Sequence, residues 1–102
     1  MKTARIVLTA GNIGNHHFYL RQCPEMIPEG GLGGTSKADR GTPFTVRFEP
    51  GPTVDTDVAK DKMIFRDRKG TRAFFEGTAA AAGDVVVLEQ VGEREILVRL
   101  EK

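Results

Sequence analysis

Short stretches of alternating apolar and polar residues, separated by glycines and prolines, constrain the fold of this chain more than any other feature. The clearest example is residues 43–49, where Phe44, Val46 and Phe48 alternate with polar side chains. A period of two places one set of side chains on each face of a strand, so we expect this segment to be half buried. Short strands separated in this way are typical of a sandwich or barrel.

Six further segments have the pattern of strands: residues 3–9, 16–21, 53–58, 62–66, 85–88 and 95–101. The two segments within 53–66 form either two strands or one bent strand. Residues 85–88 are apolar on both faces, which indicates a central strand. Residues 10–15 and 90–94 contain the residue types of turns.

A helix is predicted at residues 72–78, with Thr71 as its N-cap and two phenylalanines in its apolar stripe. Residues 79–82 extend this helix or form a second short turn. The glycine-rich segment 23–37 reads as a loop or a short turn of helix. We therefore predict a mainly β fold, an open pseudobarrel of roughly seven strands with one or two short helices.

Length and cysteine content add further bounds. The 102 residues suffice for a single domain spanning 1–102. The one cysteine, Cys23, excludes an intramolecular disulfide and is expected to be a half-buried apolar residue in a reducing, cytoplasmic setting. No apolar run approaches the ~20 residues that span a bilayer, so we expect no membrane association, and we expect a monomer.

Charge is distributed unevenly along the chain, although the formal net charge is only +1. Residues 1–72 contain twelve Lys and Arg against eight Asp and Glu, whereas residues 73–102 contain three against six. The densest basic cluster is residues 60–72, with six basic and two acidic side chains. Such a cluster is either a phosphate-binding edge or the solvated face of a strand, and composition alone does not separate the two.

Three aspartates are the best candidates for catalysis. Asp55 and Asp57, two apart on a predicted strand, would share one face, and Asp61 lies between two lysines. Clustered carboxylates that hold a divalent metal are typical of phosphodiester hydrolases. Asp61 and Lys62 lack the intervening residue found between acid and lysine in such nucleases, so we expect no enzyme activity, no cofactor and no metal.

Two weaker motifs concern metal and phosphate. His16, His17 and Cys23 raise the alternative of a zinc site, but adjacent residues on a strand point to opposite faces and no fourth ligand follows at a usual spacing. Residues 30–37 lack the Gly-Lys-Ser/Thr ending of a nucleotide-binding loop. Flexible backbone followed by Thr35, Ser36 and Lys37 can still hold a phosphate.

Paired phenylalanines in residues 72–75 are followed by a Gly-Asp turn and an apolar strand at 83–89. This order resembles the end of the B-three DNA-binding pseudobarrel family. The upstream segments resemble the bacterial branch of that family, which supplies target-recognition domains to restriction endonucleases; they are residues 18–21, 26–28, 33–37, 44–48 and 56–66. The resemblance covers nearly the whole chain.

The resemblance implies a concave face that enters the major groove of duplex DNA with two arms, here residues 11–21 (the first arm) and 59–68 (the second arm). It implies DNA contacts from the following side chains: Asn15, His17, Tyr19, Arg21, Ser36, Lys37, Arg40, Lys60, Lys62, Arg66 and Arg68. These residue types fit, because arginine reads guanine, asparagine reads adenine, and lysines and hydroxyls hold phosphate.

We therefore predict a sequence-specific double-stranded DNA-binding domain. The resemblance implies that it is the recognition module of a restriction-type system, with a separate nuclease or helicase subunit as partner. The alternatives are a metal-dependent nuclease built on the three aspartates, and a barrel that binds a protein or a small ligand. We expect Arg66→Ala and Lys62→Ala to weaken DNA binding without lowering stability, because both side chains would lie on a solvent-exposed β-ribbon, the pair of strands in the second arm.

Overall fold

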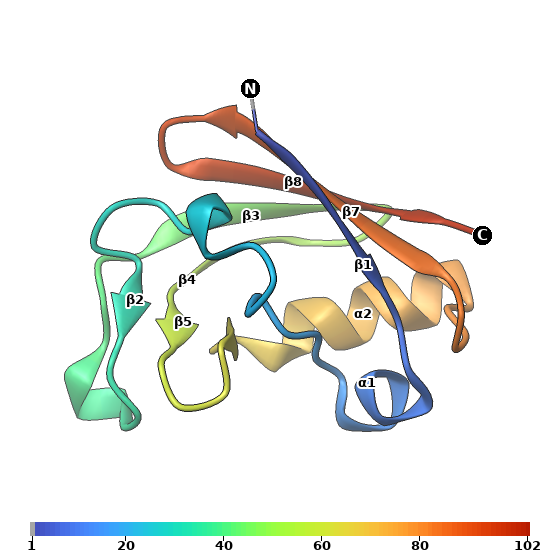
Figure 1. Ribbon diagram of the computed structural model, residues 1–102, viewed down its shortest axis with the longest axis horizontal. Coiled ribbons are helices and arrows are strands. Elements are labelled where there is room, and N and C mark those ends of the chain that lie inside the picture. The colour runs from blue at the N-terminus through green and yellow to red at the C-terminus, as the bar shows by residue number, and fades with distance from the viewer. Residues whose placement is uncertain (1) are drawn as a thin grey trace.

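A five-stranded sheet is the largest element of the computed structural model, which describes residues 2–102 (Figure 1). In spatial order its strands are β1 (Thr3–Val7), β7 (Val85–Gly92), β8 (Glu95–Glu101), β3 (Phe44–Glu49) and β4 (Thr53–Thr56). Neighbouring strands run antiparallel, except β3 and β8, which are parallel. The chain therefore reaches the centre of this sheet only with its last strand.

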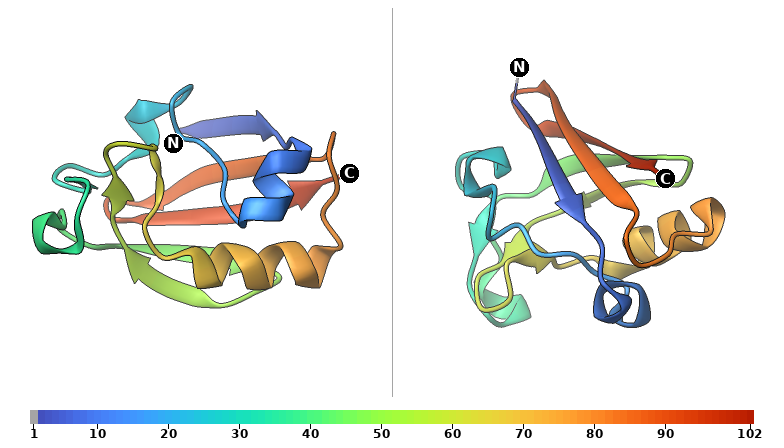
Figure 2. Two further views of the ribbon diagram at one scale, coloured as in Figure 1. Left: turned by 90° about the horizontal axis from the view of Figure 1, so that it is seen from below. Right: turned by 45° about the vertical axis from the view of Figure 1, so that its right-hand side comes forward.

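A small second sheet lies at one end of the molecule. It contains β2 (Leu32–Gly33), β5 (Val58–Ala59) and β6 (Ile64–Phe65), with β2 and β5 parallel and β5 and β6 antiparallel. The helical elements are α1 (Ala10–Asn15), α2 (Arg68–Thr78) and the short 3-10 turns η1 (Pro24–Met26) and η2 (Lys37–Asp39). Figure 2 shows α2 running beneath the large sheet, with the small sheet beyond its N-terminal end.

Within residues 2–102 the fold is mainly β, with eight strands in two mixed sheets and two short α-helices. β1 and β4 form opposite edges of the large sheet, so the sheet does not close into a barrel. The predicted mainly β, open architecture is confirmed. The number of strands is eight rather than seven, because residues 53–66 form three short strands instead of two and β2 lies in the segment 23–37 that was predicted to be a loop, whereas residues 16–21 form no strand.

The core lies between the inner face of the large sheet and α2. Its strand residues alternate as the sequence predicts and include Ile6, Phe44, Val46, Phe48, Val86, Leu88, Ile96 and Val98. Phe74 of α2 packs on Phe48, with 5.4 Å between ring centroids. Phe65 of β6 lies 5.5 Å from the ring of Phe18, 6.1 Å from Phe44 and 6.5 Å from Phe48. These aromatic contacts join the small sheet to the large one.

Cys23 belongs to this core. Its side chain is buried rather than half buried. Burial, with a smaller effect of Glu25, raises the pKa of the thiol to about 11. The thiol is therefore protonated at neutral pH, as expected for a cysteine that serves as an apolar residue.

The outer face of the large sheet is covered by charged side chains that pair with one another. Arg5 of β1 contacts Glu101 at 3.3 Å, and Arg99 of β8 contacts Glu89 at 2.7 Å. Val87 lies between Arg5 and Arg99 in the strand register and is completely buried. The two arginine stems and their ion pairs thus cover an apolar position that would otherwise face water.

The prediction for residues 10–21 is wrong in its secondary structure. Residues 10–15 form helix α1 instead of a turn, because Thr9 and Asn12 form a reciprocal capping box at its start. Residues 16–21 are irregular instead of a strand. Phe18 and Leu20 are nevertheless buried, as the alternation predicted, although His17 of the opposite set is buried as well.

Helix α2 starts earlier than predicted. It begins at Arg68, and Asp67 caps it by accepting hydrogen bonds from the N–H groups of Lys69 (2.9 Å) and Gly70 (3.4 Å). Thr71, the predicted N-cap, lies buried inside the first turns. The final hairpin also differs, since β7 continues to Gly92 with a register shift. None of the helices in residues 2–102 is long and apolar enough to cross a membrane.

Candidate nucleic-acid interface

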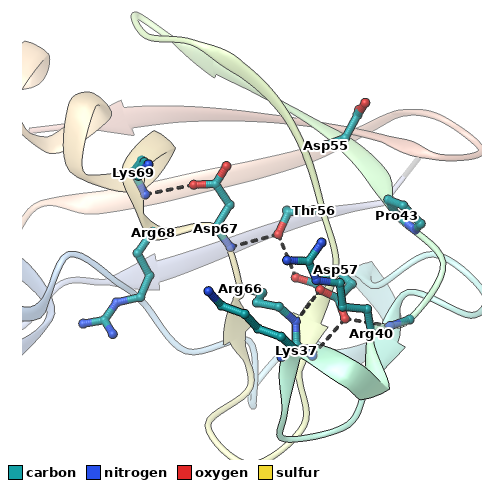
Figure 3. Close-up of a pocket in the computed structure, with 11 residues that line it drawn as sticks. Lys37, Arg40, Pro43, Asp55, Thr56, Asp57, Arg66, Asp67, Arg68 and Lys69 are labelled. Atoms are coloured by element: carbon teal, nitrogen blue, oxygen red, sulfur yellow. Dashed lines mark hydrogen bonds and ion pairs between the residues drawn. The ribbon is translucent and has the colours of Figure 1, made fainter.

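A groove of about 680 Å³ opens where the loop before β3 faces the start of α2 (Figure 3). Its residues are Lys37, Arg40, Gly41, Pro43, Asp55, Thr56, Asp57, Arg66, Asp67, Arg68 and Lys69. A smaller hollow of about 240 Å³ adjoins it and is lined by Thr35, Lys37, Ala59, Asp61, Lys62, Ile64, Arg66 and Arg68. The two hollows share Lys37, Arg66 and Arg68, so they adjoin, and together we call them the concave surface.

Unpaired positive charge gathers at this surface. Within residues 2–102, six basic side chains make no hydrogen bond or ion pair. Four of them line the hollows, namely Lys37, Arg40, Lys62 and Lys69. Lys60 is exposed beside them on the loop between β5 and β6. The sixth, Arg21, lies over the ring of Tyr19 at 4.4 Å.

Basic side chains on other parts of the protein form ion pairs or hydrogen bonds. On the sheet, Arg5, Arg47 and Arg99 pair with glutamates. Arg72 pairs with Glu76 along α2, and Lys102 pairs with Asp84. Lys2 and Arg94 donate to backbone carbonyls. The near-neutral net charge of the chain therefore hides a local excess of unpaired cations at the groove.

Arg66 is the least exposed of the predicted contact residues that line the groove. It forms an ion pair of 2.7 Å with Asp57, and the two side chains are only 12% and 4% exposed. Burial alone would raise the pKa of Asp57, but hydrogen bonds from Arg66 and from the Gly41 N–H, with the charge of Arg66, lower it below its ordinary value. The expectation that Arg66 lies on a solvated ribbon is wrong, because its guanidinium is enclosed by the protein.

The two predicted arms lie side by side. Arg68 Nη2 donates to the carbonyl oxygen of Asn15 at 2.8 Å, and the N–H of Leu20 donates to the carbonyl oxygen of Met63 at 2.7 Å. The side chain of Asn15 is turned back onto its own helix, where Nδ2 donates to the Gly11 carbonyl. The arms therefore form one surface, although the first arm begins as a helix.

His17 lies at the junction of the arms. Its side chain is buried, and neither ring nitrogen has a hydrogen-bond partner among the described residues. Burial lowers its pKa, and the charges of Arg68 and Lys62 lower it further, so the ring is neutral at pH 7. Its ring centroid is 4.9 Å from that of Tyr19. The structure places His17 beneath the surface, where it supports Tyr19.

The remaining predicted contact residues are at the rim. Tyr19 is half buried and Arg21 is exposed, and their side chains stack on each other. Ser36 is exposed and donates to Asp39 at 3.0 Å. The structure thus brings together Lys37, Arg40, Lys62, Arg66 and Arg68 in the hollows, with the other six predicted residues beside or beneath them.

The three aspartates of the nuclease alternative do not form a cluster. Asp55 is exposed and accepts a hydrogen bond from Thr45, whereas Asp57 is buried against Arg66 (Figure 3). Asp61 lines the smaller hollow. The strand breaks after Thr56, so the alternation on which the prediction rested ends there. Among residues 2–102, no three His, Cys, Asp or Glu side chains are placed to hold a metal ion.

The predicted contact residues leave out two residues of this surface. Lys69 lines the groove and its side chain has no partner among residues 2–102. It belonged to the basic cluster 60–72 and could have been chosen on that ground. Asp57 was considered only as a metal ligand, although the structure makes it the partner of Arg66. A contact between residues nine apart across a broken strand leaves no periodic signal in the sequence.

Comparison with known proteins gives one informative result. No protein-family model matches the sequence, and no curated protein matches it. In structure, the chain is similar to the N-terminal domain of Helicobacter pylori LlaJI.R1, with a TM-score of 0.64 and 7% sequence identity. The match covers 100% of this chain and 88% of that one. At this identity the likeness shows that the two domains share a fold.

Proposed function

We propose that this chain binds double-stranded DNA with the concave surface described above, sequence-specifically and without catalysing a reaction. The observation that carries the proposal is the distribution of unpaired cations. Four cations that line the hollows have no partner among residues 2–102, namely Lys37, Arg40, Lys62 and Lys69, while basic residues on the sheet are paired with glutamates. Unpaired lysines and arginines that face a groove are suited to phosphate groups, because binding releases the counterions of the DNA.

The arrangement also offers residue types for reading bases. Arg21 and Arg68 are exposed at the arms, and arginine makes the commonest specific contact, with guanine in the major groove. Tyr19 adds a flat side chain beside Arg21. The proposal assigns phosphate contacts to the lysines and Arg40, and base contacts to the arms.

The fold supports a place in a restriction-type system. The structural neighbour is the N-terminal domain of a protein whose name, LlaJI.R1, has the form given to restriction-system proteins. The proposal is that this chain is a B-three-like recognition module of that kind and acts with a separate nuclease or helicase subunit. Its role would then be to select the DNA site.

The test is a comparison of salt dependence among charge variants. Wild-type protein is titrated with a pool of random short duplexes at several salt concentrations, and the bound fraction is sequenced. We expect enrichment of one short motif and a steep loss of affinity with salt. Lys37→Ala with Lys69→Ala should lower the slope of log K against log salt by roughly 2, since each lost phosphate contact lowers it by about 1.

Arg5→Ala is the matched control, because it removes one positive charge from the outer face of the sheet. It should leave the slope within experimental error of wild type. Equal effects of Arg5→Ala and Lys37→Ala would contradict the assignment of the groove. No affinity for any duplex at low salt would contradict DNA binding, and magnesium-dependent cutting of the duplexes would contradict a role in binding alone.

A further inference from the structure

Three segments of the chain meet at Asp57 and Arg66. Asp57 lies between β4 and β5, Arg66 follows β6, and the loop 34–41 lies against both. This loop carries Lys37 and Arg40, two of the unpaired cations of the groove. The position of the loop relative to the arms therefore depends on what holds it at this meeting point.

The guanidinium of Arg66 is fully used inside the protein. Nε donates to Asp57 Oδ1 at 2.7 Å, and Nη2 donates to Asp57 Oδ2 at 3.0 Å and to the Gly34 carbonyl at 2.7 Å. Nη1 donates to the carbonyls of Ser36 at 3.2 Å and Thr35 at 3.4 Å. A guanidinium has five N–H groups, so each has an acceptor within the chain. None is left to bind a phosphate without breaking one of these contacts.

Asp57 holds the other end of the same loop. Its Oδ2 accepts a hydrogen bond of 2.8 Å from the N–H of Gly41. The approach is so close that a Cβ at Gly33 would collide with Asp57 Oδ2 and with Gly41 N. A Cβ at Gly41 would lie 2.6 Å from the carbonyl oxygen of Gly30. Glycine at 33 allows the backbone to approach the carboxylate directly, and glycine at 41 allows the end of the loop to pack against the backbone of residues 30–33.

The loop has few contacts of its own that could replace this support. Between its ends it makes one short internal turn, in which the N–H of Gly34 donates to the carbonyl of Asp39 and Ser36 contacts Asp39. It belongs to no strand ladder, and residues 35–40 are all exposed. An exposed loop without a ladder is ordered only as far as such anchors hold it.

We infer that Asp57 and Arg66 position the loop 34–41 for DNA binding and that Arg66 does not itself contact DNA. The inference rests on the proposed function. The ion pair sets where Lys37 and Arg40 lie relative to Lys69 and to the arms. Asp57 and Arg66 are thus positioning residues, acting through the cations of the loop.

Asp57→Asn separates a positioning role from an effect of charge alone, because the two predict opposite changes in DNA affinity. Removing a carboxylate from a surface that faces phosphates should tighten binding, if charge alone matters. If Asp57 positions the loop, the substitution weakens binding despite the gain in net positive charge, by roughly tenfold when one charge-assisted contact is lost. The decisive measurement is coupling to Lys37.

In a double-mutant cycle, Lys37→Ala should weaken binding roughly tenfold in the wild type and less than about threefold in Asp57→Asn, because the loop no longer holds Lys37 in place. Lys69→Ala is the matched control, since Lys69 is held by α2 rather than by the loop. Its effect should be the same in both backgrounds. Equal effects of Lys37→Ala in both backgrounds would overturn the inference, as would tighter binding by Asp57→Asn.

Arg66→Lys provides a second variant that keeps the charge. An ammonium cannot reach Asp57 and three carbonyls at once, so a positioning role predicts weaker binding, whereas a phosphate contact predicts binding close to wild type. Amide hydrogen exchange of the free protein adds a readout without DNA. In both variants, exchange should rise more at 34–41 than in β7 and β8.

The two proposals can fail separately. If the wild-type protein binds no duplex, the proposed function is wrong. If it binds DNA, yet both variants leave loop exchange and the coupling with Lys37 unchanged, only the positioning role is wrong. A variant that loses exchange protection throughout the large sheet has unfolded globally, and this too would overturn a role confined to the loop.

Discussion

Arg66 and Lys62 lie four residues apart in the same basic cluster, yet their side chains have opposite surroundings. Arg66 is enclosed by Asp57 and three backbone carbonyls, whereas Lys62 is exposed and unpaired. In the sequence both are simply basic residues of the cluster 60–72, and nothing distinguishes them. Their difference arises from a loop more than twenty residues upstream, which folds back over one of them and leaves the other open.

The first prediction concerns this difference. Arg66→Ala should lower the free energy of unfolding by about 3 kcal/mol, because it leaves the Asp57 carboxylate buried without its partner. Lys62→Ala should change it by less than about 0.5 kcal/mol, as is usual at exposed positions. Urea unfolding at pH 7 measures both. Equal stability of the two variants would mean that the ion pair is open to solvent.

The second prediction concerns His17 and acid. Its pKa is lowered by burial and by Arg68 and Lys62, so the unfolded chain binds the proton more readily than the folded one. Stability from this group is therefore present above the ordinary pKa near 6.5 and is lost as the pH falls towards the lower pKa of the folded state. Between about pH 7 and 5, wild-type protein should lose more stability than His17→Phe.

The control for His17 is His16→Asn, which removes the other histidine at a position with positive φ that asparagine tolerates. The acid sensitivity is assigned to His17 if the slope of unfolding free energy against pH falls in His17→Phe and not in His16→Asn. If His17→Phe keeps the full wild-type slope, the acid sensitivity belongs to other groups and the buried ring is not protonated on unfolding in this range.

At the scale of elements, local chemistry decided where the helices begin. Thr9 with Asn12 starts α1, and Asp67 starts α2 one turn before the predicted N-cap. Both signals are present in the sequence. Two glycines in the first segment disfavour a helix, and in the second Thr71 is an alternative N-cap four residues after Asp67.

The third prediction tests the cap of α2. Asp67→Ala should lower the unfolding free energy by about 1 kcal/mol, because the N–H groups of Lys69 and Gly70 lose their acceptor. Asp67→Ser, which can still accept one of these hydrogen bonds, should recover most of the loss. Thermal unfolding of the three proteins gives the comparison. An unchanged midpoint in Asp67→Ala would show that the helix start depends on packing alone.

Residues 16–21 show what alternation can and cannot predict. Phe18 and Leu20 are buried as their spacing indicates, but no neighbouring strand pairs with this segment. An alternation of apolar and polar residues indicates which side chains face the core. Hydrogen bonding depends on whether another strand lies within reach, and that is decided by the path of the rest of the chain.

At the scale of the whole molecule, the sequence predicted a mainly β, open fold with short helices, because most core residues lie in strands with clean alternation. It also predicted most of the cations of the groove. It could not predict which cations are free. Pairing depends on contacts such as Arg5 with Glu101 and Arg66 with Asp57, which join residues that are distant in the chain or separated by a break in a strand.

The ion pairs on the outer face of the sheet have a consequence for the kinetics of association. Arg5, Arg99 and their glutamates nearly cancel each other's field, so a polyanion that approaches from that side is neither attracted nor repelled strongly. The unpaired lysines give the groove a positive field that extends about 10 Å at 0.1 M salt. If the chain binds DNA as proposed, we expect this uneven field to turn an approaching duplex towards the groove before contact forms.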